Sequence, residues 1–389
     1  MKKEKVVILG STGSIGRQTI DVLLKTKDKE IYGLACNKNI DCLYEQVKKL
    51  KPKIVAIYDE EKSKIFEEKI KKQNIRLKIL KGLDGLCEIC SMKEVDLVVV
   101  SVVGMIGIKP TVASIKSRKR IALANKETLV CAGDYIMNLA KKHKVDIRPI
   151  DSEHSAILQC LQGEKYSSIK KLIITASGGP FYGKNKKELK NVKVSDALKH
   201  PTWHMGRKIT IDSSTLVNKA LEIIEAHFLF NIKPSNIEVL VQRQSLIHSM
   251  VLFNDGVVKA QLGVPSMRVP ISYAIYGDNR YDIKEKSIDF SKLKSITIDT
   301  VDTKTFEAIN IAYMVLNKGG LYPCVFNALD EVCVEEFLNG NIKYLDIIEY
   351  IKKGIKEFKK SNLNKVKYTI NDIDKVYRFA KTFVKNIKK

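Results

Sequence analysis

The chain has 389 residues and a formal net charge of +24, because 68 Lys and Arg residues outnumber 44 Asp and Glu residues. Its apolar fraction of 44% is ordinary for a globular protein, and no apolar run reaches the length of about 18 residues that spans a membrane. The length allows two or three domains. The positive charges are mostly scattered lysines without a nucleic-acid recognition motif, so we expect solvated helix faces and no nucleic-acid partner.

The N-terminus, "MKKEKVVILGSTG", places basic residues before a short apolar run and a glycine loop. A signal peptide needs a longer apolar region and a cleavage site, so we expect a cytoplasmic protein. Most of the 8 cysteines lie in apolar segments, as reduced core residues do. Cys87 and Cys90 form a single C-x-x-C, and the second pair that a structural zinc site requires is not evident.

Residues 1–150 alternate short apolar runs with amphipathic stretches that have helical spacing. The expected strands are residues 6–9, 31–36, 54–58, 77–80, 96–102, 121–124 and 145–150. The run "VDLVVVSVV" is almost continuous in β-branched residues, which is typical of a strand covered on both faces. This alternation predicts an α/β fold with an N-terminal doubly wound, Rossmann-like parallel sheet.

Residues 151–290 mix helix-like and strand-like segments, which predicts a central α+β catalytic domain. Within it, residues 178–208 form a long polar stretch with Gly and Pro, and connections of this length are often active-site lids. The single tryptophan, Trp203, lies on this expected lid. Residues 291–304 read as a linker, and residues 305–389 as a C-terminal helical domain.

The segment "VVILGSTGSIGRQTI" places Gly10, Gly13 and Gly16 between an expected strand and an expected helix. Glycines allow close approach of the backbone to a pyrophosphate, and the helix directs its free N–H groups toward that anion. We therefore expect a dinucleotide site. The second strand ends in "ACNKN" without the acid that binds the ribose of NAD, and Lys38 suits the extra phosphate of NADP. The alternative is an ordinary polar turn.

Asp151 and Glu153 follow the last apolar run of the first domain. In an extended backbone, residues two apart point to the same side, and two converging carboxylates repel unless a cation or a proton lies between them. Mg²⁺ and Mn²⁺ prefer such oxygen ligands. The alternative is N-terminal capping of a helix that begins at Ser152, and the two interpretations are compatible.

The segment "IDSSTLVNKALEIIEAHFLF" predicts a helix starting near Ser213. On it, Asn218 and Glu222 share a face and Lys219 lies beside them. Hydroxyl, amide and ammonium groups suit a phosphate, and Glu222 suits a metal. The alternative is a solvated face with a Lys–Glu pair.

Six motifs, "GSTGSIG", "ANKETLV", "PIDSEHSAI", "TASGGPF", "HPTWHMGRKITIDSSTLVNKALE" and "QSLIHSMV", occur in this order along the chain. Together they resemble the motifs of the 1-deoxy-D-xylulose 5-phosphate reductoisomerase family. The resemblance implies an NADP-dependent oxidoreductase of non-mevalonate isoprenoid biosynthesis, with a divalent cation, Mg²⁺ or Mn²⁺. It would convert 1-deoxy-D-xylulose 5-phosphate to 2-C-methyl-D-erythritol 4-phosphate by retro-aldol and aldol steps, followed by hydride transfer from NADPH.

The resemblance also implies roles for individual residues. The metal ligands would be Asp151, Glu153 and Glu222, and the phosphate site would be Ser177, Ser213, Asn218 and Lys219. Lys126, Ser152, Glu153 and His200 would contact the rest of the substrate, and Trp203 would cover it. The catalytic set would be Lys126, Asp151, Glu153, His200 and Glu222.

The implied cofactor contacts lie in three parts of the chain. They are Thr12, Gly13, Ser14 and Ile15 at the pyrophosphate, Asn37, Lys38 and Asn39 at the 2′-phosphate, and Asn125, Glu127 and Gly206 elsewhere on NADPH, with Met205 and Met267 beside the nicotinamide. His154 and His248 match supporting histidines of the family. Asn37 departs from the glycine that the family pattern commonly has there, and asparagine can adopt similar backbone angles.

Two other functions remain open at this point. One is another NADP-dependent sugar-phosphate or semialdehyde dehydrogenase, which would need no metal. The other is a nucleotide-sensing, nucleic-acid-binding regulator, which would show salt-sensitive binding to nucleic acid and no turnover. The resemblance favours a homodimer acting on a small phosphorylated substrate, with no nucleic acid and no membrane as partner.

Overall fold

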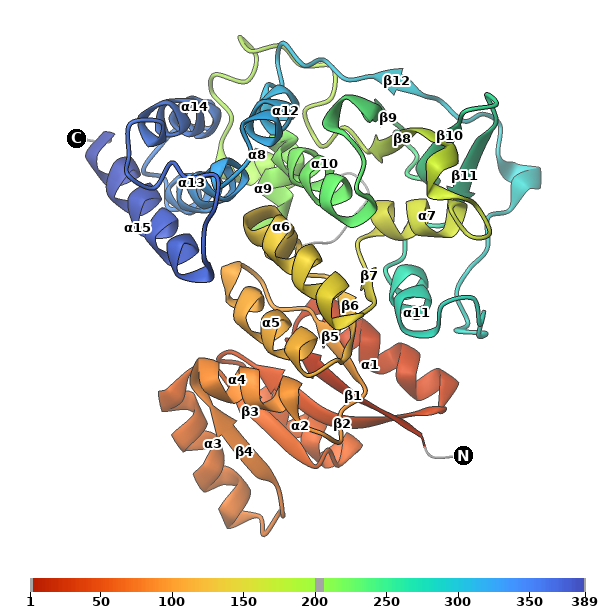
Figure 1. Cartoon of the computed structure of the whole chain (residues 1–389), viewed down its shortest axis with the longest axis vertical. Coiled ribbons are helices and arrows are strands. Elements are labelled where there is room, and N and C mark those ends of the chain that lie inside the picture. The colour runs from red at the N-terminus through yellow and green to blue at the C-terminus, as the bar shows by residue number, and fades with distance from the viewer. Residues whose placement is uncertain (1–2, 200–205, 388–389) are drawn as a thin grey trace. The chain divides into compact units, whose positions relative to one another are not determined.

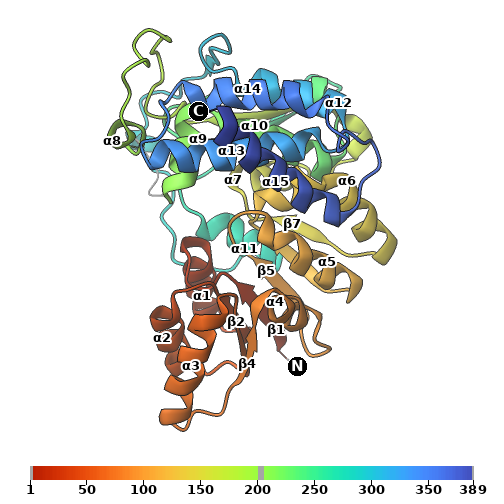
Figure 2. The ribbon, with the colours of Figure 1, turned by 90° about the vertical axis from the view of Figure 1, so that its left-hand side faces the viewer.

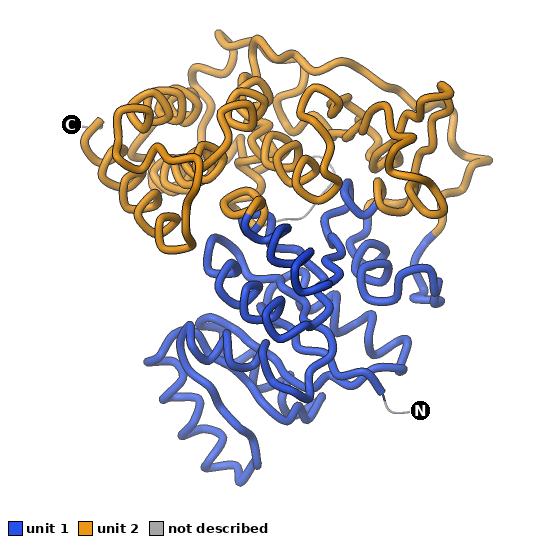
Figure 3. Tube along the Cα trace, viewed as in Figure 1, with its two compact units in different colours: residues 1–128, 135–155, 266–286 blue, residues 129–134, 156–265, 287–389 orange. Residues whose placement is uncertain are grey.

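The computed structural model describes residues 3–199 and 206–387 (Figure 1). The chain divides into two compact units, coloured separately in Figure 3. Unit 1 comprises residues 1–128, 135–155 and 266–286, and unit 2 comprises residues 129–134, 156–265 and 287–389. Among the described residues, no helix combines the length and the apolar character needed to cross a membrane.

Unit 1 is built on a parallel sheet of seven strands in the order β4-β3-β2-β1-β5-β6-β7. The strands are β1 (Glu4–Leu9), β2 (Lys29–Cys36), β3 (Ile54–Ile57), β4 (Lys78–Lys81), β5 (Leu97–Val100), β6 (Arg120–Leu123) and β7 (Ile147–Pro149). All seven expected strands are present, and the predicted α/β fold class is confirmed. Every residue of β3 and of β5 is buried, which explains their continuous apolar sequences.

Helices cover both faces of this sheet. They are α1 (Ser14–Thr26), α2 (Ile40–Leu50), α3 (Glu60–Lys72), α4 (Gly82–Ser91), α5 (Ile108–Lys116) and α11 (Arg268–Tyr276). Two further helices, α6 (Lys126–His143) and α7 (Ser152–Cys160), lie partly in unit 1 and partly in unit 2. Apolar side chains of α1, α2, α3 and α11 share one core with the sheet. On the other face, Gly33 of β2 leaves room for Ile89 of α4, 2.9 Å from where a Cβ would lie. Figure 2 shows α1 and α4 on opposite sides of the strands.

Residues 266–286 belong to unit 1, although the sequence pattern assigned them to the expected domain of residues 151–290. Arg268 Nε donates to Asp21 Oδ2 at 2.5 Å, and Tyr276 Oη donates to Asp28 Oδ1 at 2.9 Å. Local periodicity predicts a helix here but carries no information on such distant partners. The division into three domains with a linker stays a prediction.

Unit 2 contains a mixed sheet of five strands in the order β11-β10-β8-β9-β12, in which only β8 and β9 are parallel. The strands are β8 (Ile169–Ala176), β9 (Ile237–Val241), β10 (Ile247–Phe253), β11 (Val258–Leu262) and β12 (Asp299–Thr300). The first four coincide with strand-like segments of the sequence. The short β12 lies in the expected linker and was not predicted, because two residues carry no periodic signal.

The helices of unit 2 are α8 (Val194–Ala197), α9 (Arg207–Thr215), α10 (Val217–Phe230), α12 (Ala308–Lys318), α13 (Tyr322–Leu338), α14 (Asp346–Phe358) and α15 (Ile370–Ile387). Short 3-10 helices lie at Met105–Gly107 in unit 1, and at Tyr166–Ser168, Pro234–Asn236 and Phe290–Lys292 in unit 2. Helices α12, α13, α14 and α15 form the C-terminal helical region that the sequence predicted, and α13 packs against the other three (Figure 1).

The single helix expected from Ser213 is wrong in one respect. Two helices meet there, because Leu216 has left-handed backbone angles (φ 60°, ψ 14°) between α9 and α10. Ser213 therefore lies in the last turn of α9. Leucine rarely adopts this conformation, and neither Gly nor Pro marks the break, so the sequence gives no sign of it.

Candidate active site

The glycine loop of unit 1 joins β1 to α1 as expected. Gly10 has φ +81°, and a Cβ there would lie 2.5 Å from the carbonyl oxygen of Ser101. A Cβ at Gly16 would lie 2.3 Å from the carbonyl oxygen of Gly10. Gly13 precedes α1 without a side-chain cap, so the first N–H groups of the helix remain suited to an anion. Thr12 and Ile15 are half-buried, and Gly13 and Ser14 are exposed.

The three residues after β2 that we assign to the 2′-phosphate are exposed. Asn39 Oδ1 accepts a hydrogen bond from Cys42 N at 3.2 Å and so caps α2. Lys38 is 70% exposed, and its Nζ lies 3.7 Å from a carboxylate oxygen of Asp59. An exposed pair of this length is weak, so the ammonium can turn to a phosphate at little cost.

Asn125 and Glu127 are buried, which the sequence did not indicate. Asn125 Nδ2 donates to the carbonyls of Val102 and Gly104 at 3.1 and 2.9 Å, and to Glu127 Oε2 at 2.7 Å. Glu127 Oε1 accepts from Gly104 N at 3.1 Å. These two side chains therefore fix the loop that follows β5, at the carboxyl end of that strand.

The acidic pair lies where β7 gives way to α7. Asp151 precedes the helix, and its carbonyl accepts from Ser155 N at 2.8 Å, as expected of a capping position. Its Oδ2 lies 2.5 Å from Lys126 Nζ and 3.6 Å from Nδ1 of the fully buried His154. Glu153 Oε2 accepts from Ser152 Oγ at 2.6 Å. Unit 1 thus brings together four of the predicted site residues: Lys126, Asp151, Ser152 and Glu153.

The charge of Asp151 is strongly favoured. Burial raises its pKa, but the charges of Lys126 and His154 outweigh burial and hold the pKa well below the usual value of 3.8. An ionised carboxylate at neutral pH is the form that binds a metal.

Unit 2 brings together the residues expected to bind phosphate. Ser177 follows β8, Ser213 lies in the last turn of α9, and Asn218 and Lys219 lie in the first turn of α10. The start of α10 adds backbone N–H groups, an anion-binding feature that the sequence did not show because the helix break was not predicted.

Two sets of contacts position the segments that carry Ser177 and Ser213. Gly179 lies so close to α9 that a Cβ would be 2.8 Å from the carbonyl oxygen of Ser213. Arg243 donates to the carbonyls of Ser177 and Gly179 at 2.8 and 3.1 Å. No motif in the sequence singled out Arg243, because its partners are backbone atoms.

Glu222 is 1% exposed, so the alternative of a solvated helix face is wrong. Its Oε1 accepts from Asn218 Nδ2 at 2.6 Å, and its Oε2 forms an ion pair with Lys219 Nζ. Since Lys219 is 5% exposed, this is a buried ion pair within one helix.

His200, Trp203 and Met205 lie outside the described residues. Gly206 is exposed directly before α9, and Met267 is half-buried before α11. His248 is 8% exposed on β10. Burial raises the pKa of the Cys87 and Cys90 thiols, which is the opposite of what a reactive redox pair requires.

Comparisons with known proteins agree with these observations. Three family descriptions match the chain: 1-deoxy-D-xylulose 5-phosphate reductoisomerase over residues 6–133, its C-terminal domain over residues 147–230, and the DXP reductoisomerase C-terminal domain over residues 262–381. Two proteins named 1-deoxy-D-xylulose 5-phosphate reductoisomerase are close in sequence. The one from Lachnospira eligens is 50% identical over 354 residues, covering 91% of this chain and 93% of that protein. The one from Clostridium perfringens is 47% identical over 356 residues, covering 91% and 93%.

Solved structures give the same result. The 1-deoxy-D-xylulose 5-phosphate reductoisomerase from Zymomonas mobilis in complex with NADPH is 33% identical, with a TM-score of 0.92 and 100% of both chains covered. DOX-P reductoisomerase in complex with NADPH, fosmidomycin and magnesium is 34% identical, with a TM-score of 0.92 and 99% of both chains covered. The chain belongs to the 1-deoxy-D-xylulose 5-phosphate reductoisomerase family.

Proposed function

We propose that this protein converts 1-deoxy-D-xylulose 5-phosphate to 2-C-methyl-D-erythritol 4-phosphate with NADPH and one divalent cation. Family membership supports the reaction, and the relatives solved with NADPH and with magnesium support both cofactors. The feature that most directly supports the residue roles is the burial of Glu222 between an amide and an ammonium group, in the helix whose first turn suits a phosphate.

We assign the cation to Asp151, Glu153 and Glu222. The donors fit, because all are carboxylates, and hard divalent cations take oxygen ligands. In each unit an ammonium group already pairs with one of these acids, Lys126 with Asp151 and Lys219 with Glu222, as expected of carboxylates that require a positive partner.

The phosphate of the substrate binds to Ser177, Ser213, Asn218 and Lys219. The two hydroxyls, the amide and the ammonium group are donors, and the start of α10 favours an anion. Lys126, Ser152 and His200 contact the remaining oxygens of the substrate, and Trp203 on the segment 178–208 covers it and excludes water.

NADPH binds at the carboxyl edge of the sheet in unit 1. Its pyrophosphate lies against residues 12–15 and the start of α1, and Lys38 pairs with the 2′-phosphate. Asn125 and Glu127 act by shaping the loop at 102–104 that lines this edge.

The bound cation would polarise carbonyl and hydroxyl oxygens of the substrate during carbon–carbon bond cleavage and formation, and NADPH would supply the hydride. Asp151 stays ionised, because its pKa lies well below the usual value, and it therefore supplies negative charge to the proposed cation site. Lys126, next to Asp151, donates hydrogen bonds to the oxygen that develops negative charge. Ser213, Asn218 and Lys219 fix the opposite end of the substrate and so orient its reacting atoms.

The test follows NADPH absorbance with 1-deoxy-D-xylulose 5-phosphate, with and without a chelator. We expect turnover that stops on chelation and returns with Mg²⁺ or Mn²⁺. Full turnover in chelator would favour a metal-independent dehydrogenase. Binding of nucleic acid that weakens with salt, without turnover, would favour the regulator.

We also propose a homodimer that forms through β11. This strand is an edge of its sheet, and Val257, Val258 and Leu262 are 52%, 48% and 36% exposed. An exposed apolar edge is suited to pairing with a second copy. Light scattering should give twice the chain mass of 44.0 kDa, and Val258→Lys should shift it toward one chain. A wild-type mass of one chain would contradict the dimer.

The expected cytoplasmic location can be checked by cell fractionation.

A further inference from the structure

We propose that Tyr344 is a positioning residue for phosphate binding, because its hydroxyl fixes the junction between α9 and α10. The junction carries Ser213 on one side and Asn218 and Lys219 on the other. This inference rests on the proposed phosphate site. It gives the C-terminal helical region, which lies far from the motifs in sequence, an indirect part in binding the substrate.

The hydroxyl satisfies a backbone carbonyl that the helix break leaves without a helical partner. Tyr344 Oη donates to the carbonyl of Ser214 at 2.7 Å. This carbonyl lies in the last turn of α9, where intrahelical donors are lacking, and the left-handed Leu216 turns the chain away immediately after it. Ser214 is fully buried and Tyr344 is 3% exposed, so the bond is shielded from bulk water and its loss leaves the carbonyl without this donor.

Tyr344 remains a donor at neutral pH. Burial raises the pKa of its hydroxyl far above neutrality, although the hydrogen bond to Ser214 acts in the opposite direction.

The same ring contacts the other side of the phosphate site. Phe181 packs edge-on against Tyr344, with ring centroids 5.2 Å apart. Phe181 follows the Gly178–Gly179 turn, and Gly179 lies against the carbonyl of Ser213. Tyr344 therefore contacts both segments that carry the hydroxyls of the proposed phosphate site. One is the segment after Ser177, and the other includes Ser213.

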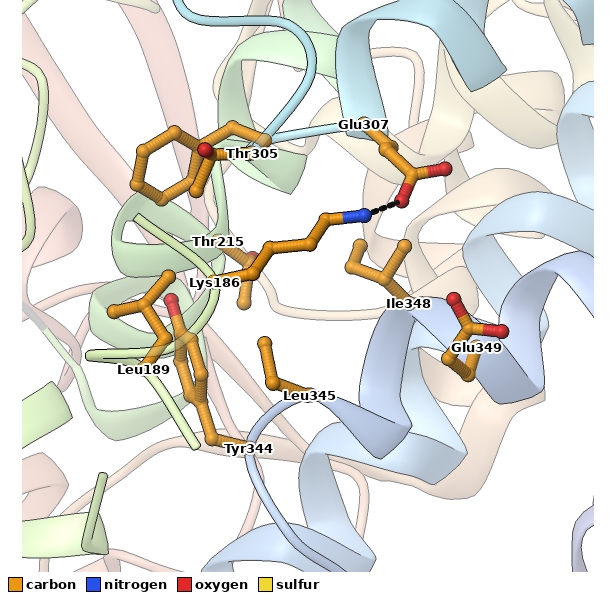
Figure 4. A pocket seen from close by; sticks show the side chains of 10 residues that line it. Lys186, Leu189, Thr215, Thr305, Glu307, Tyr344, Leu345, Ile348 and Glu349 are labelled. Carbon is orange, nitrogen blue, oxygen red and sulfur yellow. Dashed lines mark hydrogen bonds and ion pairs between the residues drawn. The ribbon is translucent and has the colours of Figure 1, made fainter. Parts of the chain in front are cut away.

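Phe181 and Phe337 pack against Tyr344, with ring centroids 5.2 and 5.8 Å from the centroid of its own ring. A cavity of about 120 Å³ adjoins it, lined mainly by apolar side chains such as Leu189, Leu345 and Ile348. Figure 4 shows Lys186 extending across this cavity to its ion pair with Glu307, with Tyr344 at the edge of the cavity. The hydrogen bond to Ser214 adds a polar contact to this packing and so fixes the position of the hydroxyl.

The test compares Tyr344→Phe with Tyr313→Phe. Tyr313 is a matched control in the same unit, since its hydroxyl donates to the carbonyl of Ile237 at 2.8 Å, away from the phosphate site. With saturating NADPH and Mg²⁺, Tyr344→Phe should raise KM for the substrate about five- to tenfold, the effect of one lost hydrogen bond, with kcat within about twofold. The inhibition constant of inorganic phosphate should rise by the same factor. Tyr313→Phe should leave both constants within about twofold of wild type.

Ser213→Ala separates the inference from the proposed site. If Ser213→Ala raises KM but Tyr344→Phe does not, the role of Tyr344 is wrong and the phosphate site stands. If Ser213→Ala leaves KM unchanged, the proposed site is wrong, and the inference falls with it. A purely structural role would lower the melting temperature of Tyr344→Phe and of Tyr313→Phe without changing KM, and that result would also overturn the inference.

Discussion

Glu222→Gln is the substitution that probes the metal site most directly. It preserves the size of the side chain and an oxygen that can accept from Asn218 Nδ2, now 2.6 Å from Glu222 Oε1. It removes the charge that a cation would bind and that Lys219 now neutralises. The variant therefore separates the charge of Glu222 from its shape.

Two magnitudes follow from the burial of this side chain. At an effective dielectric constant of about 20, a unit charge at about 4 Å contributes on the order of 4 kcal/mol. Solvent and the remaining ligands of the cation would replace part of this electrostatic stabilisation. We therefore expect the affinity for Mn²⁺ and kcat/KM to fall about 10²- to 10³-fold. Leaving the buried Lys219 without its carboxylate costs about 3–5 kcal/mol in the free energy of unfolding, which corresponds to about 6–20 °C in melting temperature for a unit of this size.

The assay is turnover at increasing Mn²⁺ concentrations, together with thermal unfolding and NADPH binding. Asp330→Asn is the control, because Asp330 is a fully buried acid of the same unit, 2.8 Å from Lys208 Nζ and outside the proposed metal ligands. The control should lose stability while its dependence on metal stays that of wild type. Wild-type metal dependence in a folded Glu222→Gln protein would refute the reasoning.

Three further predictions concern unit 1. Gly16→Ala should abolish NADPH binding, measured by fluorescence, and cost about 1–3 kcal/mol, because its Cβ would lie 2.3 Å from the carbonyl oxygen of the first glycine of the loop; normal binding would contradict this packing. Lys38→Ala should raise KM about tenfold for NADPH and leave KM for NADH unchanged; equal changes would exclude a 2′-phosphate role. Burial raises the pKa of Glu4, but hydrogen bonds from Lys29 and Arg120 outweigh it and lower the pKa below 4.5. The charged Glu4 side chain therefore stabilises the fold fully above pH 4.5, and this stabilisation is lost as the pH falls through the lower pKa of the folded protein. Urea unfolding should show Glu4→Gln to be less stable than wild type by about 1 kcal/mol at pH 7 and equally stable in strong acid.

The sequence predicted the fold of unit 1 and most of its elements, because apolar runs and helical periodicity are local properties. It also predicted the family, which the comparisons confirm. The sequence could not predict that residues 266–286 belong to unit 1, because Arg268 and Tyr276 bind Asp21 and Asp28, which lie 247 and 248 residues earlier in the chain.

The sequence singled out the charged residues of the candidate site, but it did not predict the helix break and the backbone contacts that position them. An amide and an acid four apart on a helix carry chemical meaning in their spacing. The extended backbone expected between Asp151 and Glu153 is wrong, because Glu153 lies in the first turn of α7. The break at Leu216 was missed because nothing in its side chain favours a left-handed backbone. Arg243 and Tyr344 were missed because each acts on backbone carbonyls, which have no signature in the sequence.

The pairing of Lys219 with Glu222 has a consequence for how a cation and a phosphate would affect each other's binding. One ammonium group cannot serve both the acid of its own helix and an arriving phosphate at full strength. In the site that we propose, a cation bound to Glu222 would free Lys219 for the phosphate, and a phosphate bound to Lys219 would leave Glu222 open to a cation. By thermodynamic reciprocity, each ligand would then raise the affinity for the other by the same factor.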